Sequence, residues 1–395
     1  MKRILFLHQA STIGGGSYCL LNILREIDKT QIKPIVCLVG DGPLRNELEK
    51  LGIEIIMFPQ MCAVPYNRSI FNINSLKTYL RVRQSIYSFK KILMDNKIDI
   101  VYLNNMMIYP YLAPAKECGC KTILHCREHW PVNEHKRQLQ WAQKAVSQYC
   151  DQLIAINNYS ASIFPRTKAI IVHDWIDMDS RYEFYSLSKI FEENLNDKKV
   201  YLYTGGVQRI KGAKEVISTF VDDINDPKAR LLIVGIDKEI ELGGIKDQIK
   251  KSLAKIGIRS YYYNLLRLIN SDNRIKCIPS TYMLAHIMQQ CYCNLSYFTI
   301  PHANLALAEC EIMGIPSIAA DNDEAREYSL DGQLSLLFKQ NDRKAFIEAI
   351  KEMDIKINTY KANLSLRLNY IKEKFSKEHN VSNLNNAISR VISDI

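Results

Sequence analysis

Residues 301–320 read PHANLALAECEIMGIPSIAA, and this stretch indicates the type of fold. A helix that carries Glu309 is followed by Gly314-Ile-Pro316, a combination that ends helices. The apolar residues 317–320 then predict a short buried strand. This alternation is typical of open parallel sheets, whose ligands bind beyond the strand ends. We therefore expect Glu309 to present a carboxylate at such an edge.

The rest of the chain repeats this alternation, which predicts an α/β fold with doubly wound parallel sheets. Strands are predicted at residues 4–7, 35–39, 53–58, 98–103, 122–125 and 152–156, and again at 199–204, 229–235, 275–278, 293–297 and 317–320. Helices are predicted near 17–27, 75–96, 134–150 and 282–290, around Glu309, and in the tail from 342 to 395. A mixed polar segment beginning at residues 173–177 separates the two series of strands and predicts an interdomain hinge.

The length of 395 residues exceeds what one hydrophobic core usually supports, so we expect two domains. They are placed at residues 1–180 and 181–370, followed by a helical tail, 371–395, that packs back on the first domain. No apolar run approaches the ~18 residues of a membrane span. The apolar segment after Lys2 and Arg3 is too short for a secretory signal and predicts a buried strand.

Most of the eleven cysteines lie in or beside apolar runs rather than at the spacings of a disulfide framework. This usage indicates a reducing compartment, hence a cytoplasmic protein. Cys118-Gly-Cys120 and Cys291-Tyr-Cys293 have no second Cys-x-x-Cys pair at zinc-finger spacing. Ordinary thiols are therefore the better interpretation.

The formal net charge of +10 suits either nucleic acid or an anionic membrane surface as a partner. Basic residues gather in segments 77–91 and 249–259, where apolar and aromatic residues recur at helical spacing. Such helices can lie on anionic lipid headgroups, and they can equally bury their apolar face in the core with the lysines in water. No nucleic-acid-binding motif is present, so nucleic acid is not an expected partner.

Two glycine-rich loops join predicted strands to predicted helices, at residues 14–16 and 204–212. Their glycines let the backbone approach a diphosphate, and a helix N-terminus offers unpaired N–H groups. In the second loop Arg209 and Lys211 supply positive charge for a leaving group that becomes more negative. Neither loop matches Gly-x-Gly-x-x-Gly or the P-loop pattern, so dinucleotide oxidoreduction and ATP hydrolysis are disfavoured.

In the order of its motifs the chain resembles the retaining GT-B nucleotide-sugar glycosyltransferases of family 4, or group 1. The resemblance extends over nearly the whole chain and rests on residues 13–17, 20–24, 42–53, 173–177, 205–212, 232–235 and 309–327. It implies two Rossmann-like domains that face each other across a cleft, the first on the acceptor side and the second binding the donor. It also implies a nucleotide diphosphate sugar as co-substrate and no metal cofactor.

The resemblance also implies roles for particular residues. Lys211 matches the lysine that grips the donor diphosphate, and Glu309 matches the acid that holds the ribose hydroxyls. With Arg209, Lys211 is expected to act in catalysis. The expected donor-binding residues are Gly15, Gly16, Gly205, Gly206, His302, Asn304, Leu305 and Glu309.

Two positions depart from the family pattern. The family usually has an acid eight residues before Glu309, where this chain has Pro301, and an arginine after the first loop glycine, where it has Gly206. We expect Arg209 to supply the missing charge, and His302 or nearby backbone amides to contact the sugar. The departures keep a second hypothesis open, a catalytically silent GT-B protein that partners an active transferase. A sugar-nucleotide epimerase has no support beyond the architecture.

His125 begins the segment 125–130, HCREHW, at the end of a predicted strand, so we expect it at the sheet edge facing the cleft. The family often has a histidine here that contacts the donor sugar or the acceptor, which makes His125 a third expected catalytic residue. Three histidines and two acids between residues 125 and 135 also suggest a metal, but their spacing fits no standard site. A core histidine bonded to backbone is the alternative interpretation.

The resemblance implies a retaining hexosyltransferase, in which the acceptor hydroxyl attacks the sugar face from which the phosphate leaves. We expect the acceptor to be a cell-surface polysaccharide or a lipid-linked glycan precursor, which the positive charge favours. Because the departing phosphate can take the proton, no pair of carboxylates is required. We expect the enzyme in the cytoplasm, peripheral on the inner face of the cell membrane, with an anionic lipid surface as a partner.

Overall fold

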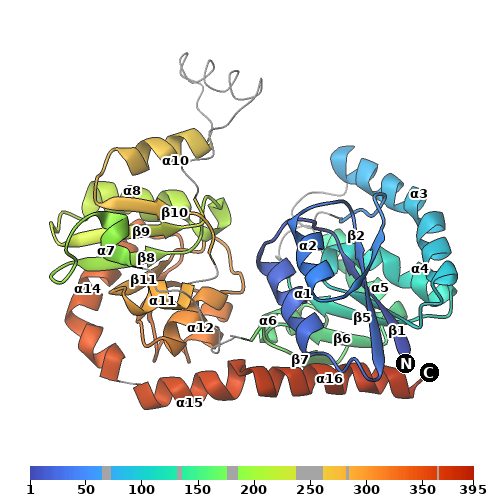
Figure 1. Cartoon of the computed structure of the whole chain (residues 1–395). Coiled ribbons are helices and arrows are strands. Elements are labelled where there is room, and N and C mark those ends of the chain that lie inside the picture. The colour runs from blue at the N-terminus through green and yellow to red at the C-terminus, as the bar shows by residue number, and fades with distance from the viewer. Residues whose placement is uncertain (65–72, 131–135, 176–185, 237–260, 282–283, 363) are drawn as a thin grey trace. The chain divides into compact units, whose positions relative to one another are not determined.

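The chain divides into two compact units (Figure 1). The computed structural model describes all residues except 65–72, 131–135, 176–185, 237–260, 282–283 and 363. The first unit contains Met1–Trp175 together with Lys374–Ile395, and the second contains Ile176–Glu373. The second unit is therefore an insertion between two parts of the first.

The first unit is built on a parallel sheet. Its described strands are β1 (Lys2–His8), β2 (Ile32–Leu38), β3 (Glu54–Met57), β4 (Ile100–Leu103), β5 (Lys121–Cys126), β6 (Gln152–Ala155) and β7 (Ala169–Ile171). They lie in the order β3-β2-β1-β4-β5-β6-β7, with Leu5 beside Ile35 on one side and Val101 on the other. The strand order reverses between β1 and β4, and ligands of open sheets bind beyond the strand ends at such a point.

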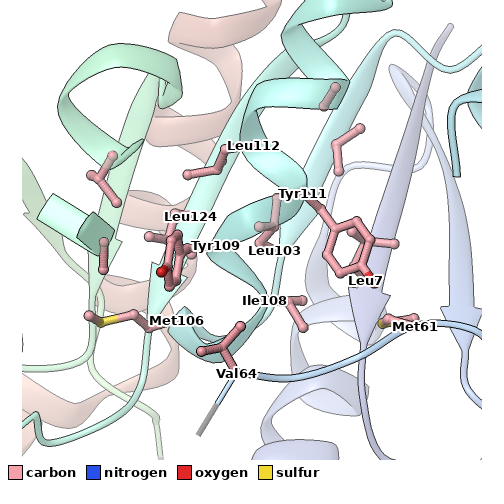
Figure 2. Close-up of a cluster of buried hydrophobic side chains, with 14 of the residues drawn as sticks. Leu7, Met61, Val64, Leu103, Met106, Ile108, Tyr109, Tyr111, Leu112 and Leu124 are labelled. Atoms are coloured by element: carbon pink, nitrogen blue, oxygen red, sulfur yellow. The ribbon is translucent and has the colours of Figure 1, made fainter. Parts of the chain in front are cut away.

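Helices cover both faces of this sheet. They are α1 (Gly15–Glu26), α2 (Pro43–Lys50), α3 (Ile73–Asp95), the 3-10 helix η1 (Met106–Tyr111), α4 (Leu112–Glu117), α5 (Lys136–Tyr149), α6 (Asn158–Ser162) and α16 (Lys377–Ser393). Buried residues of α1, α2 and α16 pack on one face, and those of α3, η1, α4 and α5 pack on the other. Figure 2 shows part of the second cluster, where Tyr109 and Tyr111 of η1 lie among Leu103, Leu112 and Leu124.

Alternation along β1 explains why both faces need a cover. Ile4 and Phe6 belong to the cluster on one face, and Leu5 and Leu7 belong to the cluster on the other. All four are fully buried. Since burial of a side chain of this size stabilises a fold by about 1.5–3 kcal/mol, the central strands account for much of the stability of the unit.

The second unit contains another parallel sheet. Its described strands are β8 (Lys199–Tyr203), β9 (Ala229–Val234), β10 (Ile275–Ile278), β11 (Cys293–Ser296), β12 (Ser317–Asp321) and β13 (Leu336–Lys339), in the order β10-β9-β8-β11-β12-β13. The helices around it are α7 (Leu187–Phe191), the 3-10 helix η2 (Arg209–Lys211), α8 (Ala213–Asp223), α10 (Tyr261–Asn270), α11 (Leu284–Gln289), α12 (Leu305–Ile312), α13 (Asp323–Tyr328), α14 (Arg343–Ala362) and α15 (Leu364–Phe375).

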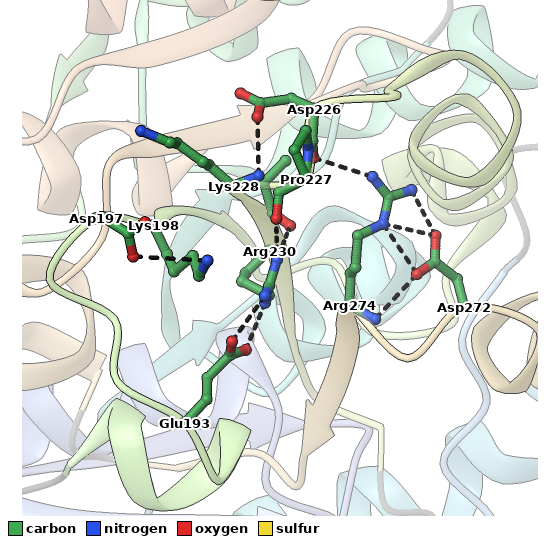
Figure 3. A network of polar contacts seen from close by, with 10 residues as sticks. Glu193, Asp197, Lys198, Asp226, Pro227, Lys228, Arg230, Asp272 and Arg274 are labelled. Carbon is green, nitrogen blue, oxygen red and sulfur yellow. Dashed lines mark hydrogen bonds and ion pairs between the residues drawn. The ribbon is translucent and has the colours of Figure 1, made fainter.

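Ion pairs fasten the N-terminal edge of the second sheet (Figure 3). Arg230, near the start of β9, contacts Glu193 at 2.7 Å between Nη2 and Oε2. Arg274, just before β10, contacts Asp272 at 2.6 Å and donates to the carbonyl oxygen of Ile224, also at 2.6 Å. The glycine-rich loop and the start of α12 lie at the opposite, C-terminal edge of the sheet.

The α/β prediction is confirmed, since both sheets are parallel with helices on both faces. Every predicted strand is present, most of them with somewhat different bounds, but β7 and β13 are not predicted from the sequence. Both are short edge strands of three and four residues, which give too little alternation to recognise. The predicted basic segment 249–259 lies outside the described residues. Among the helices that the structure describes, none is both long and apolar enough to cross a membrane.

Candidate functional site

The glycine-rich loop of the second unit packs tightly on the sheet below it. A Cβ atom on Gly205 would lie 2.0 Å from Tyr203 Oη, and one on Gly212 would lie 2.0 Å from the carbonyl oxygen of Tyr297. Gly212 also has a φ of +77°, in the left-handed region that favours glycine. Glycine is therefore required at both ends of the loop.

Two hydrogen bonds fix the part of the loop that carries the charge. Tyr203 Oη donates to the carbonyl oxygen of Lys211 at 3.2 Å. The backbone N–H of Thr299, in the segment after β11, donates to the carbonyl oxygen of Ile210 at 2.9 Å. The backbone at Lys211 is thus held from the ends of two neighbouring strands.

Gly206 explains one departure from the family pattern. Its φ is +56°, its N–H donates to Val234 O at 3.2 Å, and a Cβ would lie 3.0 Å from the carbonyl oxygen of Gly235. Gly235 itself has a φ of +97°. An arginine at position 206 would have to adopt a left-handed conformation against this backbone, so the local packing favours glycine.

Lys211 and Glu309 interact electrostatically at the C-terminal edge of the sheet. Both side chains are partly buried. Burial raises the pKa of Glu309 to about 7, and the positive charge of Lys211 opposes this shift. Burial also lowers the pKa of Lys211, and the carboxylate of Glu309 opposes that shift in turn. A cation and an acid that titrates near neutral pH therefore share one region, which is typical of functional sites.

Arg209 has a different environment from the one expected for a diphosphate ligand. Its side chain is exposed, and its guanidinium lies 4.3 Å from the centroid of the Tyr261 ring of α10, a cation–π contact. Binding of an anion by Arg209 would have to compete with this contact. Its expected role in catalysis stays a prediction.

The start of α12 contains three of the predicted donor-binding residues. Asn304 is buried and its Nδ2 donates to Ser296 Oγ at 2.6 Å, so this amide anchors the helix to β11. The ring of His302 contacts Phe298 edge-on with centroids 5.8 Å apart, and Leu305 is partly buried. These contacts place Glu309 one turn further along a helix whose start is fixed.

In the first unit, Gly15 and Gly16 form the first turn of α1 rather than a loop before it. They are exposed, and a Cβ on either would meet nothing within 4 Å. Glycine at these positions leaves the first amides of the helix accessible, and such amides attract anions.

A buried polar network, not predicted from the sequence, lies behind this turn. His8 Nε2 is 2.9 Å from Ser17 Oγ, and His8 Nδ1 is 3.1 Å from Asn104 Nδ2. Asn104 Oδ1 accepts from Arg127 Nε at 3.2 Å, and Arg127 forms an ion pair with Asp174. The network joins the ends of β1, β4 and β5 to the start of α1.

The hydrogen bonds determine the protonation of His8. Ser17 donates its own proton to Thr12 O at 2.8 Å, so the proton shared with His8 belongs to His8 Nε2. Burial, together with the charge of Arg127, lowers the pKa of His8 to about 4. A neutral ring that donates to Ser17 cannot act as its base, so the pair holds the turn in place and supplies no nucleophile.

His125 lies inside β5, one residue before its end, and is buried, whereas the sequence predicts it at the sheet edge facing the cleft. It is 1% exposed, pairs with Ile154 of β6, and its Nδ1 is 2.6 Å from Tyr102 Oη. Burial, aided by Arg127, lowers its pKa well below the usual value. The alternation of the strand turns the side chain toward the sheet face covered by α1. The expected role of His125 in catalysis stays a prediction.

Glu128 is a further candidate residue for the functional site, and no motif in the sequence identifies it. Its carboxylate accepts backbone N–H bonds from Met106 at 2.8 Å and from Arg127 at 3.2 Å. Burial outweighs these bonds and raises the pKa of Glu128 to about 7. The only signal in the sequence is its place two residues after β5, at the C-terminal edge of the sheet.

Across the described residues, no group of three or more His, Cys, Asp or Glu side chains is close enough to hold a metal ion. The region between residues 125 and 135 is only partly covered by this statement, because Glu134 and His135 lie outside the described residues. Independence from metal stays an expectation.

No protein-family model matches the chain, and no curated protein matches it by sequence. Solved structures do match it. Anabaena HepE in complex with UDP and glucose superposes with a TM-score of 0.72 at 17% identity, with 100% of each chain covered. A glycosyltransferase from Rickettsia africae gives 0.69 at 14% identity, covering 100% of this chain and 99% of the other. Sucrose-phosphate synthase from Thermosynechococcus elongatus gives 0.69 at 12%, with 100% of both chains covered. The chain therefore has the GT-B fold, with two Rossmann-like domains.

Proposed function

We propose that the chain is a glycosyltransferase that moves a hexosyl unit from a nucleotide diphosphate sugar to an acceptor hydroxyl. The observation that carries this proposal is the electrostatic coupling of Lys211 and Glu309 beside the glycine-rich loop. The amides of the loop and the Lys211 ammonium suit a diphosphate, and the carboxylate of Glu309 suits the ribose hydroxyls. UDP sugars are the first donors to test, because HepE is described with UDP and with UDP-glucose.

In the proposed reaction, the bond between the anomeric carbon and the phosphate oxygen breaks while the acceptor oxygen bonds to the same carbon. The acceptor proton passes to the departing phosphate, so the charges balance without a dedicated base. Lys211 stabilises the negative charge that develops on the leaving group. We propose retention of the anomeric configuration and no metal, as the resemblance implies.

The acceptor that we propose is a cell-surface polysaccharide or a lipid-linked glycan precursor. A lipid-linked acceptor would place the enzyme in the cytoplasm at the inner face of the cell membrane. The positive charge of the chain supports this, since the cytoplasmic leaflet is anionic.

The test is release of nucleoside diphosphate from a panel of UDP, GDP and ADP sugars, with and without a lipid extract. We expect one donor to be consumed, and consumption to increase when the extract is added. Lys211→Ala should lower this release about 100- to 1000-fold, and release at the wild-type rate would overturn the role proposed for Lys211. Absence of release with every donor would overturn the proposal.

A catalytically silent protein that partners an active transferase is the second candidate. It is favoured by Pro301, which stands where the family has an acid near the donor sugar. The two candidates differ in one measurement. UDP-glucose would raise the melting temperature of a silent protein that still binds it, but the donor would not be consumed. The enzyme would show the higher melting temperature and would also consume the donor.

Nucleotide binding is expected to depend on pH through Glu309. The carboxylate form, which accepts from the ribose, becomes dominant as pH rises through about 7. Wild-type affinity for UDP should therefore be about tenfold higher at pH 8.5 than at pH 5.5, beyond the change seen in Glu309→Gln. The phosphate of UDP titrates equally in both proteins, so their difference isolates Glu309. Calorimetry at several pH values measures it, and parallel profiles would contradict the proposed role.

The raised pKa of Glu309 should also affect how the stability of the free protein depends on pH. Its folded pKa lies above the unfolded value of about 4.5, so the folded state binds the proton more strongly. Stability should fall as pH rises from about 4.5 through about 7. Glu309→Gln should then be more stable than wild type at pH 8, and the two should converge near pH 5.

A further inference from the structure

Helix α3 exposes apolar side chains on the side that faces away from the core. The residues concerned are 51–80% exposed: Ile73, Leu76, Leu80, Tyr87 and Met94. At 3.6 residues per turn they fall within an arc of roughly 60°. The buried residues Val82, Ser85, Phe89 and Leu93 lie on the opposite side of the same helix. We call the exposed set the α3 stripe.

Basic residues flank the stripe. Lys77, Arg81, Arg83 and Lys91 are exposed, and none of them forms an ion pair with a residue that the structure describes. The sequence contains no Asp or Glu between residues 55 and 94. The nearest acid along the chain is Asp95, the last residue of α3, which is exposed and lies one turn after Lys91. The other three basic side chains have no acidic counterpart nearby along the chain.

Helix α5 adds an aromatic side chain beside α3. Trp141 is exposed, and its ring meets Tyr79 of α3 edge-on with centroids 5.6 Å apart. Trp is favoured at the boundary between lipid and water because its ring is apolar and its N–H is polar. The helix itself brings Lys136, Arg137 and Lys144 and contains no acid.

The net positive charge of the chain comes from the unit that carries the stripe. The first unit holds 25 of the 52 Lys and Arg residues and 15 of the 42 Asp and Glu residues. The second unit holds 27 of each sign. The formal net charge of +10 therefore belongs entirely to the first unit.

We propose that the α3 stripe docks the first unit onto an anionic lipid bilayer. The apolar side chains would enter the headgroup region, and the flanking bases would contact anionic headgroups. A second copy of the chain fits less well, because it would bring two basic surfaces together. Nucleic acid does not explain the apolar stripe. The proposal extends the proposed function, since a lipid-linked acceptor is presented at such a surface, but it is tested without sugar transfer.

The test is sedimentation of the full chain with vesicles of phosphatidylcholine alone or with about one-third phosphatidylglycerol. One variant removes apolar area, Leu80→Ser with Tyr87→Ser. Another removes charge, Lys77→Gln with Arg81→Gln, Arg83→Gln and Lys91→Gln. Matched controls change exposed residues of α14 in the neutral unit: Ile355→Ser, which is 83% exposed, and Lys344→Gln with Lys351→Gln.

We expect binding to the anionic vesicles only, weakened by salt. Each stripe variant should lower the partition coefficient about tenfold or more, and the α14 controls should leave it unchanged. The proposal is overturned by absence of binding to the anionic vesicles or by equal binding of wild type and stripe variants. It is also overturned if the chain forms a dimer that the stripe variants dissociate. Vesicle binding that persists in a protein without transferase activity would refute the proposed function and leave this inference intact.

Discussion

Replacing Lys211 by alanine is expected to lower the turnover number for the preferred donor about 100- to 1000-fold. The ammonium group of Lys211 is the charge of the loop that interacts electrostatically with Glu309, and it would stabilise the departing diphosphate. The hydrogen bond from Tyr203 goes to the backbone oxygen of Lys211, so it survives the substitution. The loss should therefore reflect the missing charge and not a collapsed loop. Initial rates of nucleoside diphosphate release measure it.

Lys214→Ala is the matched control. Lys214 lies one turn further along, at the start of α8, and is exposed. Its removal takes away the same charge without touching the expected leaving group, so turnover should change less than about twofold. Comparable losses for Lys211→Ala and Lys214→Ala would mean that general positive charge matters and that Lys211 has no special role.

The second large effect concerns stability and arises from a buried ion pair. Arg367 of α15 and Glu311 of α12 are both fully buried, with Nε 2.7 Å from Oε2. Glu311 also accepts from Ser335, and Arg367 donates to Tyr360 O at 2.6 Å. Burial raises the pKa of Glu311 to about 8 even though Arg367 opposes the shift. The pair anchors the helix that carries Glu309.

Arg367→Met should destabilise the second unit by about 3–5 kcal/mol, because it leaves the carboxyl of Glu311 buried without its partner. The double variant Glu311→Met with Arg367→Met should recover most of this loss, since no charge is then buried. The deficit of the single variant should grow with pH, because the unpaired carboxyl is tolerated only while protonated. Arg326→Met, which breaks the exposed pair with Asp321, should cost at most about 1 kcal/mol.

The chain offers a way to assign these changes to one unit. All three tryptophans, Trp130, Trp141 and Trp175, lie in the first unit. Urea unfolding followed by tryptophan fluorescence therefore reports the first unit, whereas far-UV circular dichroism reports both. Arg367→Met should shift only the dichroism transition to lower urea. A shift of both transitions, or a double variant no more stable than the single one, would contradict the account of a local buried pair.

Most of the fold is predictable from the sequence because the strands can be recognised as apolar runs. Residues 275–278 are predicted with their observed bounds, and β1 and β5 differ by two residues or fewer at each end. The start of α1 at Gly15 is missed because glycine is a poor helix former in general and favours loops. Here Gly15 and Gly16 begin the helix nevertheless, since the network around Ser17 and Asn104 holds the first turn.

The candidate site is predictable only where its residues are near each other in the sequence or fit a motif. Lys211 and Glu309 are found through motifs. Asn104 and His8 are 96 residues apart, and Arg367 and Glu311 are 56 apart, so neither contact leaves a local pattern. For His125 the sequence indicates the end of a strand, but which face the side chain points to depends on the register with β6.

The position of helix α16 in the chain affects how the protein folds during translation. Its buried residues Leu384, Ala387, Ile388 and Val391 complete the core of the first unit, and they are synthesised only after the whole second unit. Nascent domains generally fold as units in the order in which they emerge. Here the inserted domain is fully translated while its host still lacks a helix, so the part made first is the part finished last.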